Sequence, residues 1–242
     1  MDTVRLNNDG MRCDKTRRNN VEVKQAMTLE TAETRRKLLE TAAVVFAEHG
    51  FTATTIRMIS GRAKVNVAAV NYHFGSKEAL YHEVLRYVRR CAYEKYPMHC
   101  GLAPDATNEE RLFAFVHSFL LRIFGEESNL GFGTLMIREM VEPTSALDMI
   151  VDEGIRALFG QLVDIVQALM GENADMDLVQ VCSRSVISQC VFYLCSRSVL
   201  NRMNPEQTFG PADVELISEQ ITAFTLNALQ GMRVNNGGRP RS

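Results

Sequence analysis

The residues best suited to chemistry lie within a stretch of about twenty positions, 55–77, where small and polar side chains gather. Asparagine can form paired hydrogen bonds with adenine, and an alanine methyl group can contact the methyl group of thymine. A short helix that carries such residues near its N-terminal end fits the major groove of DNA. The base-facing candidates are Asn66, Val67, Ala68, Ala69 and Asn71.

Residues on either side of this group are typical of contacts with the phosphate backbone. Hydroxyl, imidazole and cationic side chains fix the register of a protein on DNA without reading its sequence. The candidates of this kind are Thr55, Arg57, Tyr72, His73 and Lys77. Two short helices joined by a tight turn have the dimensions of a helix-turn-helix. The same pair could also serve as a protein-packing motif, and spacing alone does not separate the two.

A second group of candidates lies on apolar helical faces of the C-terminal part and could line a small-molecule pocket. Twelve Met and twelve Phe in the chain would suit an adaptable apolar pocket. The candidates are His117, Phe119, Phe124, Met136, Arg138, Met140, Met149, Phe159 and Tyr193. For any single one of the apolar residues, ordinary core packing is the favoured explanation, and Arg138 could belong to a structural or surface ion pair instead of binding a ligand charge.

Signatures of enzymes and of cofactor or metal sites are absent from the sequence. It contains none of the glycine-rich phosphate motifs, the zinc-protease helix motif or the nucleophile elbow. The six cysteines form no C-x-x-C pair, and Cys91, His99 and Cys100 match no zinc spacing. We therefore predict a protein that is not an enzyme and binds no cofactor or metal.

Hydrophobic residues recur at helical spacing along almost the whole chain, which predicts an all-α fold. No stretch alternates apolar and polar residues as a half-buried strand would. Between loops, caps and prolines the expected helices span 32–49, 56–62, 66–72, 77–94, 109–125, 130–141, 144–170, 176–203 and 211–231. The expected organisation is a disordered arm (1–31), a DNA-binding domain (32–96), a helical sensor and dimerisation domain (97–232) and a disordered tail (233–242).

Charge is distributed unevenly between the two parts of the chain. Residues 1–90 carry a net charge of +6 and residues 91–242 a net charge of −8, although the whole chain has only −2. A basic N-terminal part favours an anionic partner such as nucleic acid. The N-terminus has no apolar segment of a signal peptide, and no run reaches the ~18 apolar residues that span a bilayer. We expect a cytoplasmic protein without a membrane partner.

The last two long helices are expected to form a homodimer interface. The first is apolar almost all round near residues 186–195, and the second carries one apolar stripe. Pairing with a symmetry mate would give a four-helix interface. The interface candidates are Val186, Cys190, Val214, Ile217, Ile221 and Phe224.

The stretch from residue 33 to 88 resembles the N-terminal domain of TetR regulators. The matching elements are Ala42, Phe46, Gly50 and Phe51, then Thr54-Thr55-Ile56, then Tyr72-His73-Phe74-x-Ser76-Lys77-Glu78-x-Leu80. The combination is specific, and it implies a helix-turn-helix with the base-facing and phosphate-facing residues given above. One position departs from the family pattern, because Lys64 occupies the turn where glycine is usual.

The segment around residues 136–162 is similar to the CecR-type subgroup of this family, which shares an Arg-Glu pair followed by a Pro-Thr pair. The resemblance implies a dimeric repressor whose C-terminal domain binds a small apolar or amphipathic effector. In such regulators the ligand tilts the fourth helix and changes the spacing of the two DNA-reading heads. A regulator triggered by thiol oxidation or metal, or a helical interaction protein that has lost operator binding, remains an alternative.

Overall fold

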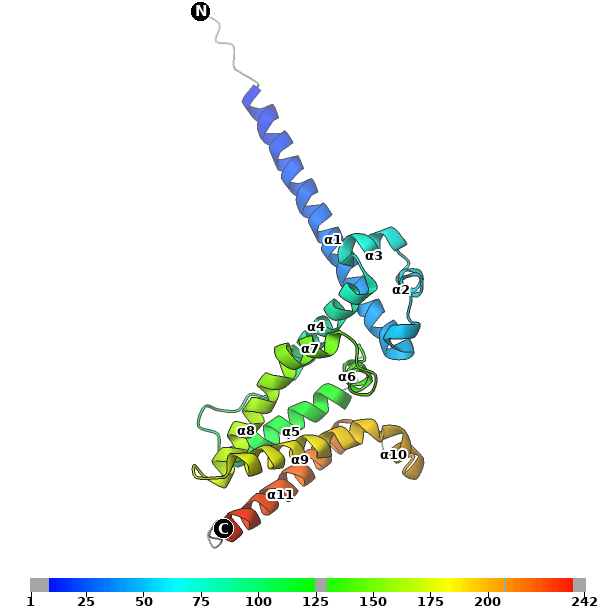
Figure 1. Ribbon diagram of the computed structural model, residues 1–242. Helices are drawn as coiled ribbons and strands as arrows, with labels where there is room; N and C mark the ends of the chain where they lie inside the picture. The colour runs from blue at the N-terminus through cyan, green and yellow to red at the C-terminus, as the bar shows by residue number, and fades with distance from the viewer. Residues whose placement is uncertain (1–8, 125–129, 207, 237–242) are drawn as a thin grey trace, which may run out of the picture.

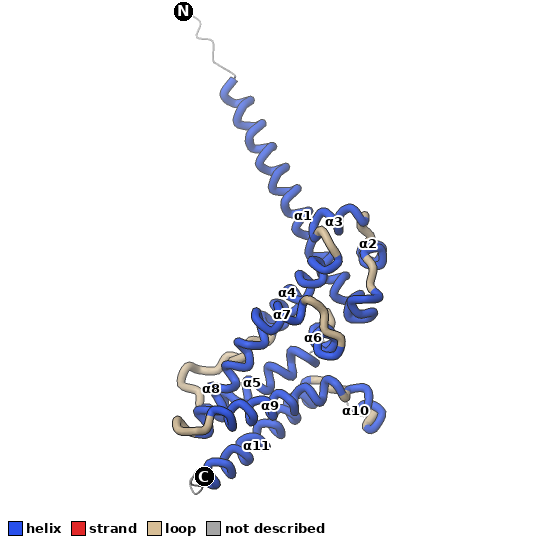
Figure 2. Tube along the Cα trace, viewed as in Figure 1, coloured by secondary structure: helices blue, strands red, loops and turns tan. Residues whose placement is uncertain are grey.

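The computed structural model describes the backbone of residues 9–124, 130–206 and 208–236, and it is helical with no strand in those ranges (Figures 1 and 2). Side chains are described over 30–124, 130–206 and 208–233. The elements are α1 (Asp9–Ala53), α2 (Ile56–Ala63), α3 (Val67–Phe74), α4 (Lys77–Lys95), α5 (Asn108–Phe124), α6 (Phe132–Val141), α7 (Ala146–Ile150), the π-helical turn η1 (Val151–Ile155), α8 (Arg156–Met170), α9 (Met176–Cys195), α10 (Arg197–Met203) and α11 (Pro211–Asn236). The all-α prediction is confirmed.

Helix α1 begins far earlier than the sequence periodicity indicates. The expected disordered arm over 1–31 is wrong for residues 9–31, which continue the helix and project away from the body in Figure 1; residues 1–8 lie outside the described part. No proline occurs before residue 97 and no glycine between residues 11 and 49, so nothing in this stretch breaks a helix. The expected stop at Gly50 is present, because this residue has φ 77° and ψ 171° inside the assigned helix.

Helices α2, α3 and α4 begin at side-chain caps that the sequence indicates. Thr55 accepts a hydrogen bond from the Met58 amide, Asn66 from the Ala68 amide and Ser76 from the Ala79 amide. Lys64 ends α2 in the left-handed region, with φ 55° and ψ 45°. The turn therefore keeps the conformation that favours glycine although a lysine occupies it.

Two helices of the C-terminal part are interrupted where the sequence predicts continuous ones. The segment expected over 144–170 contains the π-helical turn η1 between α7 and α8, and Gly154 lies within that turn. The segment expected over 176–203 is divided at Ser196 into α9 and α10. The tail expected from residue 233 is helical to Asn236, and residues 237–242 lie outside the described part.

Buried apolar side chains form two cores. The first joins α1–α4, and it also includes Phe132 and Leu135 of α6 and Ala146 and Ile150 of α7. The second joins α5, α8, α9 and α11. Helix α6 and the start of α7 thus belong to the C-terminal part in sequence but pack against the N-terminal helices. This shared packing connects the predicted DNA-binding domain with the rest of the chain.

Most of the predicted dimer-interface residues lie inside the second core. Val186, Cys190, Val214, Ile217 and Ile221 are buried within the protomer, so their assignment to a dimer interface is wrong. The stripe of α11 that the sequence shows as apolar is the one that packs against the protomer's own α5. Phe224, which is 60% exposed, remains available to a partner.

Among the described residues, one helix meets the length and apolarity of a membrane span, namely α9 over Met176–Cys195. This is weak evidence of a span, because core helices pass the same test. One face of α9 packs in the second core, whereas Val181 and Phe192 are exposed.

Candidate nucleic-acid interface and ligand cavity

The surface of α3 and its preceding turn is open to a large partner. Asn66, Val67, Ala68 and Asn71 are exposed, and Tyr72 at the end of the helix is 81% exposed. Ala69 is half-buried. The opposite face anchors the helix in the first core through Val70 and Phe74. An eight-residue helix with small or polar residues outward is an arrangement that can enter a major groove.

Two of the predicted DNA contacts also cap helices. The Asn66 carboxamide oxygen lies 2.9 Å from the Ala68 amide, and the Thr55 hydroxyl oxygen lies 3.2 Å from the Met58 amide. The Asn66 amide group remains as a donor, and so does the Thr55 hydroxyl. Arg57 is exposed on α2, while His73 is half-buried beside Tyr72.

Lys77 has a structural role that the sequence does not indicate. Its ammonium group donates to the carbonyl oxygens of Phe51 at 3.1 Å and Thr54 at 3.2 Å, with Thr52 at 3.5 Å. It also lies 4.4 Å from the centroid of the Phe51 ring. A cation in this place satisfies carbonyl groups at the end of α1, and its charge interacts favourably with the dipole of that helix. The predicted phosphate contact of Lys77 stays a prediction.

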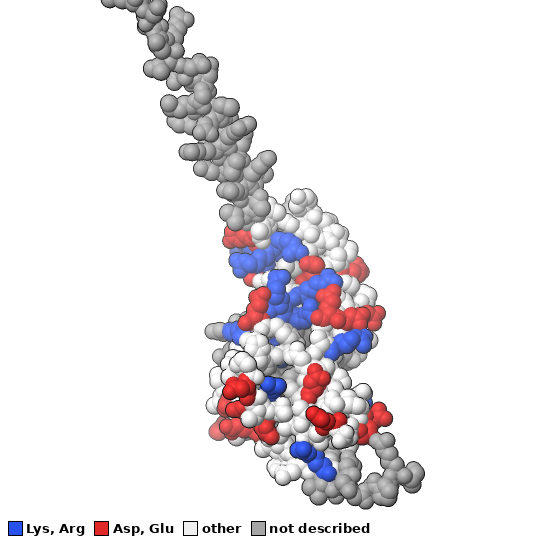
Figure 3. All heavy atoms as spheres, turned by 90° about the vertical axis from the view of Figure 1, so that its left-hand side faces the viewer, with Lys and Arg blue, Asp and Glu red and all other residues white. Residues whose placement is uncertain are grey.

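Lys and Arg side chains gather at the level of the N-terminal helices on the face drawn in Figure 3, interleaved with Asp and Glu. Several cations of the N-terminal helices are paired, because Arg35 contacts Glu83 at 2.7 Å and Arg62 contacts Glu48. The Arg62 guanidinium holds the pKa of the Glu48 carboxyl below its ordinary value. Glu83 and Glu48 both lie within the first 90 residues, so these pairs are already counted in the net charge of +6 and leave that excess in place.

The Arg-Glu pair of α6 contacts the N-terminal helices directly. Arg138 donates to the carbonyl oxygens of Ala47 and Glu48, both at 3.1 Å, near the end of α1. A Cβ atom at Gly50 would lie 2.9 Å from the Arg138 guanidinium, so a side chain there would disturb this contact. Arg138 was expected near a ligand, and the structure places it against α1 instead.

Glu139 forms a buried hydrogen-bond centre between α4 and the start of α7. Its carboxylate accepts from the Tyr81 hydroxyl at 2.7 Å and from the Thr144 amide and hydroxyl at 3.0–3.1 Å. Burial, with the nearby carboxylate, raises the pKa of Tyr81 far above its ordinary value. The Arg-Glu and Pro-Thr pairs of the sequence thus meet in space and bind α6 to α1 and α4.

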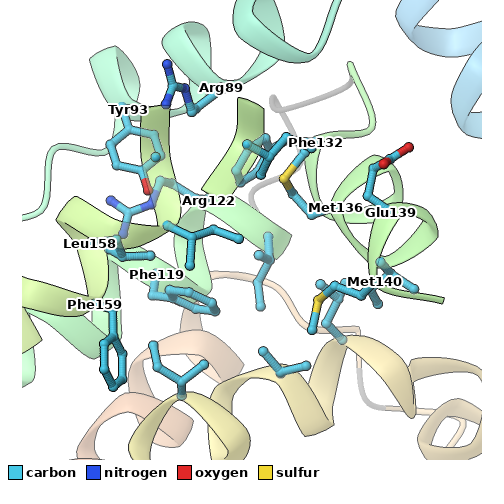
Figure 4. Close-up of a pocket in the computed structure, with 18 of the residues that line it drawn as sticks. Arg89, Tyr93, Phe119, Arg122, Phe132, Met136, Glu139, Met140, Leu158 and Phe159 are labelled. Carbon is cyan, nitrogen blue, oxygen red and sulfur yellow. The ribbon is translucent and has the colours of Figure 1, made fainter. Parts of the chain in front are cut away.

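A cavity of about 200 Å³ lies between α4, α5, α6, α8 and α9 (Figure 4). Its wall is almost entirely apolar, and four predicted pocket residues contribute to it: Phe119, Met136, Met140 and Phe159. Helix α6 contributes Met136, Ile137 and Met140 to this wall, while Arg138 and Glu139 reach the N-terminal helices. One helix therefore contacts both the cavity and the predicted DNA-binding domain.

The other predicted pocket residues lie elsewhere. His117 contacts the Ser218 hydroxyl at 3.2 Å and Glu215 at 3.4 Å on α11. Phe124 stacks on Phe209, and Tyr193 packs edge-on against the same ring. Met149 packs against the first core. The core-packing explanation, weighed for these residues from the sequence, fits Phe124, Met149 and Tyr193.

Sequence reasoning missed three polar residues of the cavity wall, namely Arg89, Tyr93 and Arg122, and it named Glu139 as a residue that could bind a ligand charge. The Arg89 guanidinium donates to both the carboxylate and the backbone carbonyl oxygen of Glu153. Arg122 is only 1% exposed, and its neighbours Leu120, Leu121, Ile123 and Phe124 are all apolar. That apolar run around an arginine was the available signal, because a charged residue inside such a run is unusual unless it has a partner.

Three of the cysteines are poorly suited to thiolate chemistry. Burial raises the pKa of the Cys190 thiol to about 12, and it also raises the pKa of Cys100 and Cys182. Because the thiolate is the reactive form, these three are poor redox sensors. Over the described residues, no group of three or more His, Cys, Asp or Glu side chains is arranged to hold a metal ion.

Comparisons with known proteins agree with this arrangement. The family model for the N-terminal domain of the TetR family of bacterial regulatory proteins matches residues 38–84. The model for the C-terminal domain of the HTH-type transcriptional dual regulator CecR matches residues 108–229, half of the chain. CecR of Shigella flexneri is 25% identical over 221 residues, covering 86% of this chain and 96% of its own length. The HTH-type transcriptional repressor NicS of Pseudomonas putida is 26% identical, covering 90% and 99%.

Solved structures share the fold at lower identity. AibR, whose structure contains isovaleryl coenzyme A and operator DNA, superposes with a TM-score of 0.61 at 17% identity, covering 79% of this chain and 97% of its own. A TetR-family regulator from Bordetella parapertussis gives a TM-score of 0.62 at 16% identity, covering 79% and 93%. With both of its parts matched by family models, the chain belongs to the TetR family of transcriptional regulators, with a CecR-type C-terminal domain, and is not an enzyme.

Proposed function

We propose that this protein is a repressor that binds a palindromic operator as a homodimer and leaves it when a small apolar or amphipathic molecule occupies the cavity. The observation that carries this proposal is the position of α6. Met136, Ile137 and Met140 line the cavity, and Arg138 and Glu139 of the same helix bind α1 and α4. A ligand that prefers a shifted α6 would shift the helices that hold α3, and the difference in ligand affinity between the two arrangements sets the size of the response.

The proposed division of labour follows the sequence. Residues 32–96 read DNA, with Asn66, Val67, Ala68, Ala69 and Asn71 toward the bases. Thr55, Arg57, Tyr72, His73 and Lys77 contact phosphates. Residues 97–232 bind the effector and the second protomer. Exposure of α3 and of Tyr72 supports the first assignment, and the cavity supports the second.

The homodimer face is assigned to the exposed sides of α9, α10 and α11. Large apolar side chains that one protomer leaves exposed there are Val181, Phe192, Val199, Met203, Leu216 and Phe224. Exposed apolar patches of this kind commonly mark association sites. A twofold pair of reading heads would then meet two successive major grooves about 34–36 Å apart.

The test is selection of bound duplexes from a random pool with the full-length protein at physiological salt. We expect a palindrome whose half-sites lie about one helical turn apart. The Asn71→Ala variant should lose discrimination at one base position, and Tyr72→Ala should weaken binding to all duplexes equally. Failure to enrich any sequence, with or without candidate effectors, would contradict operator binding.

A further inference from the structure

Arg122 is a buried cation whose hydrogen bonds are incomplete. Its Nη1 donates to the Tyr96 carbonyl oxygen at 2.7 Å, near the end of α4, and its guanidinium carbon lies 4.4 Å from the centroid of the Tyr93 ring. Its Nη2 is buried and has no hydrogen-bond partner. A buried donor without a partner is costly, and it persists where another group completes it or where function requires it.

No acidic side chain of the described residues accepts a hydrogen bond from the unpaired Nη2 of Arg122. None forms an ion pair with it, and the only carboxylate on the cavity wall, Glu139, is engaged by Tyr81 and Thr144. Figure 4 shows the Glu139 carboxylate pointing away from the cavity, whereas Arg122 and Tyr93 share one wall. Arg89, the second cation of the wall, is paired with Glu153. The wall therefore carries an excess of positive charge that is concentrated at Arg122.

The rest of the cavity is suited to an apolar body of limited size. Aromatic and aliphatic side chains form most of the rest of the wall, including Phe119, Phe132, Met136 and Phe159. A cavity of 150 Å³ with similar walls accommodates benzene, so about 200 Å³ accommodates one ring, or a short alkyl chain, with one small substituent.

We propose that the cavity binds a small monocarboxylate, with its apolar body among Phe119, Met136 and Phe159 and its carboxylate accepting a hydrogen bond from Nη2 of Arg122. A guanidinium and a carboxylate match in charge and in planar geometry, and their hydrogen bonds are stronger than neutral ones. The proposal rests on the proposed function only in taking this cavity as the effector site, and it adds the chemical class of the effector.

Calorimetric titration of the full-length protein with matched acids and amides tests this assignment. The probes are benzoate and benzamide, phenylacetate and phenylacetamide, and octanoate and octanamide. We expect at least one acid to bind at least tenfold more tightly than its amide. Arg122→Met should lower the affinity for that acid at least tenfold and leave the amide unchanged, and Arg122→Lys should retain part of the acid preference. Arg86→Met removes the same charge from α4 outside the cavity wall and should bind like wild type.

Three results would overturn the proposal: equal affinity for acids and amides, an Arg122→Met variant that binds acids like wild type, or no binding of any acid at millimolar concentration. Should Arg122→Met fail to fold, the acid–amide comparison in the wild type and Arg122→Lys still decide the question. Release of operator DNA is measured separately. If an acid binds through Arg122 but does not release operator DNA, the carboxylate site stands and the effector function is rejected. If only amides release operator DNA, the effector function stands and the carboxylate site is rejected.

Discussion

Lys77 stabilises the N-terminal helices through three carbonyl groups at the end of α1. Hydrogen bonds from a charged donor contribute about 1.5–3 kcal/mol. Because Lys77 is half-exposed and one contact is long, we expect Lys77→Met to lower the free energy of unfolding by about 1–2 kcal/mol. Urea denaturation followed by circular dichroism measures this change.

Arg57→Met is the matched control, since Arg57 is an exposed cation of the same surface. It should weaken DNA binding and change the free energy of unfolding by less than about 0.5 kcal/mol. Identical unfolding curves for Lys77→Met and wild type would remove this structural role.

Lys64 adopts a backbone conformation that disfavours any residue with a Cβ atom. The left-handed region costs an L-residue roughly 1–2 kcal/mol, and the greater freedom of glycine in the unfolded chain offsets roughly 0.5–1 kcal/mol of that. We therefore expect Lys64→Gly to raise the free energy of unfolding by about 0.5–1 kcal/mol. Thermal denaturation at fixed concentration measures it, with Lys64→Ala as the control that removes the charge but keeps the strain. If the glycine and alanine variants melt together, the turn stores no such strain.

At the level of helices, the buried hydrogen bond between Tyr81 of α4 and Glu139 of α6 joins the two parts of the chain. Tyr81→Phe should lower the free energy of unfolding by about 1–3 kcal/mol at pH 7, because it leaves a buried carboxylate with one donor fewer. Loss of less than about 0.5 kcal/mol would mean that Thr144 alone satisfies Glu139. Tyr72→Phe, at an exposed tyrosine, is the control.

The same bond predicts how stability depends on alkaline pH. The folded protein raises the pKa of Tyr81, whereas an unfolded tyrosine ionises at about pH 10. Above that pH the unfolded state binds fewer protons than the folded state, so stability falls as the pH rises. Tyr87 and Tyr93 also have raised pKa values and contribute in the same direction. We expect Tyr81→Phe to make the decline between pH 9 and 11 shallower without abolishing it, as urea denaturation at each pH would show. An unchanged slope would assign the decline to the other tyrosines.

The helices that sequence predicts well are those whose ends are chemically marked. Thr55, Asn66 and Ser76 cap α2, α3 and α4, and Pro97 and Gly171 follow two other helices closely. The π-helical turn at Val151–Ile155 has only Gly154 as a local marker, and a single glycine inside a helical pattern does not specify a π-helical turn.

Helical periodicity identifies a buried stripe, but it does not say which neighbour covers that stripe. Ile217 and Ile221 therefore suggested a dimer interface, although the protomer's own helices cover them. The cavity was predictable in its apolar residues for the same reason, since Phe119 and Met136 lie on apolar stripes. The apolar run around Arg122 indicates that this residue is unusual, but the sequence does not indicate what it contacts, because that contact depends on α4 and α5 coming together.

At the scale of the whole molecule, α9 and α11 expose apolar side chains on the faces that do not pack in the second core. Phe224 and Leu216 of α11 are 60% and 65% exposed, and Phe192 of α9 is 54% exposed. If a second protomer covers them, an aspartate at position 224 buries a charge without a partner, which typically costs several kcal/mol. We expect Phe224→Asp to sediment as a folded monomer and to bind a palindromic duplex no better than a single half-site.

Ile221→Asp, one turn earlier but in the protomer core, should instead lose helical signal and melting cooperativity. The contrast separates association from folding: a Phe224→Asp dimer with normal operator affinity would place the interface on another face, while loss of helix in Phe224→Asp would show that this side chain supports the protomer itself.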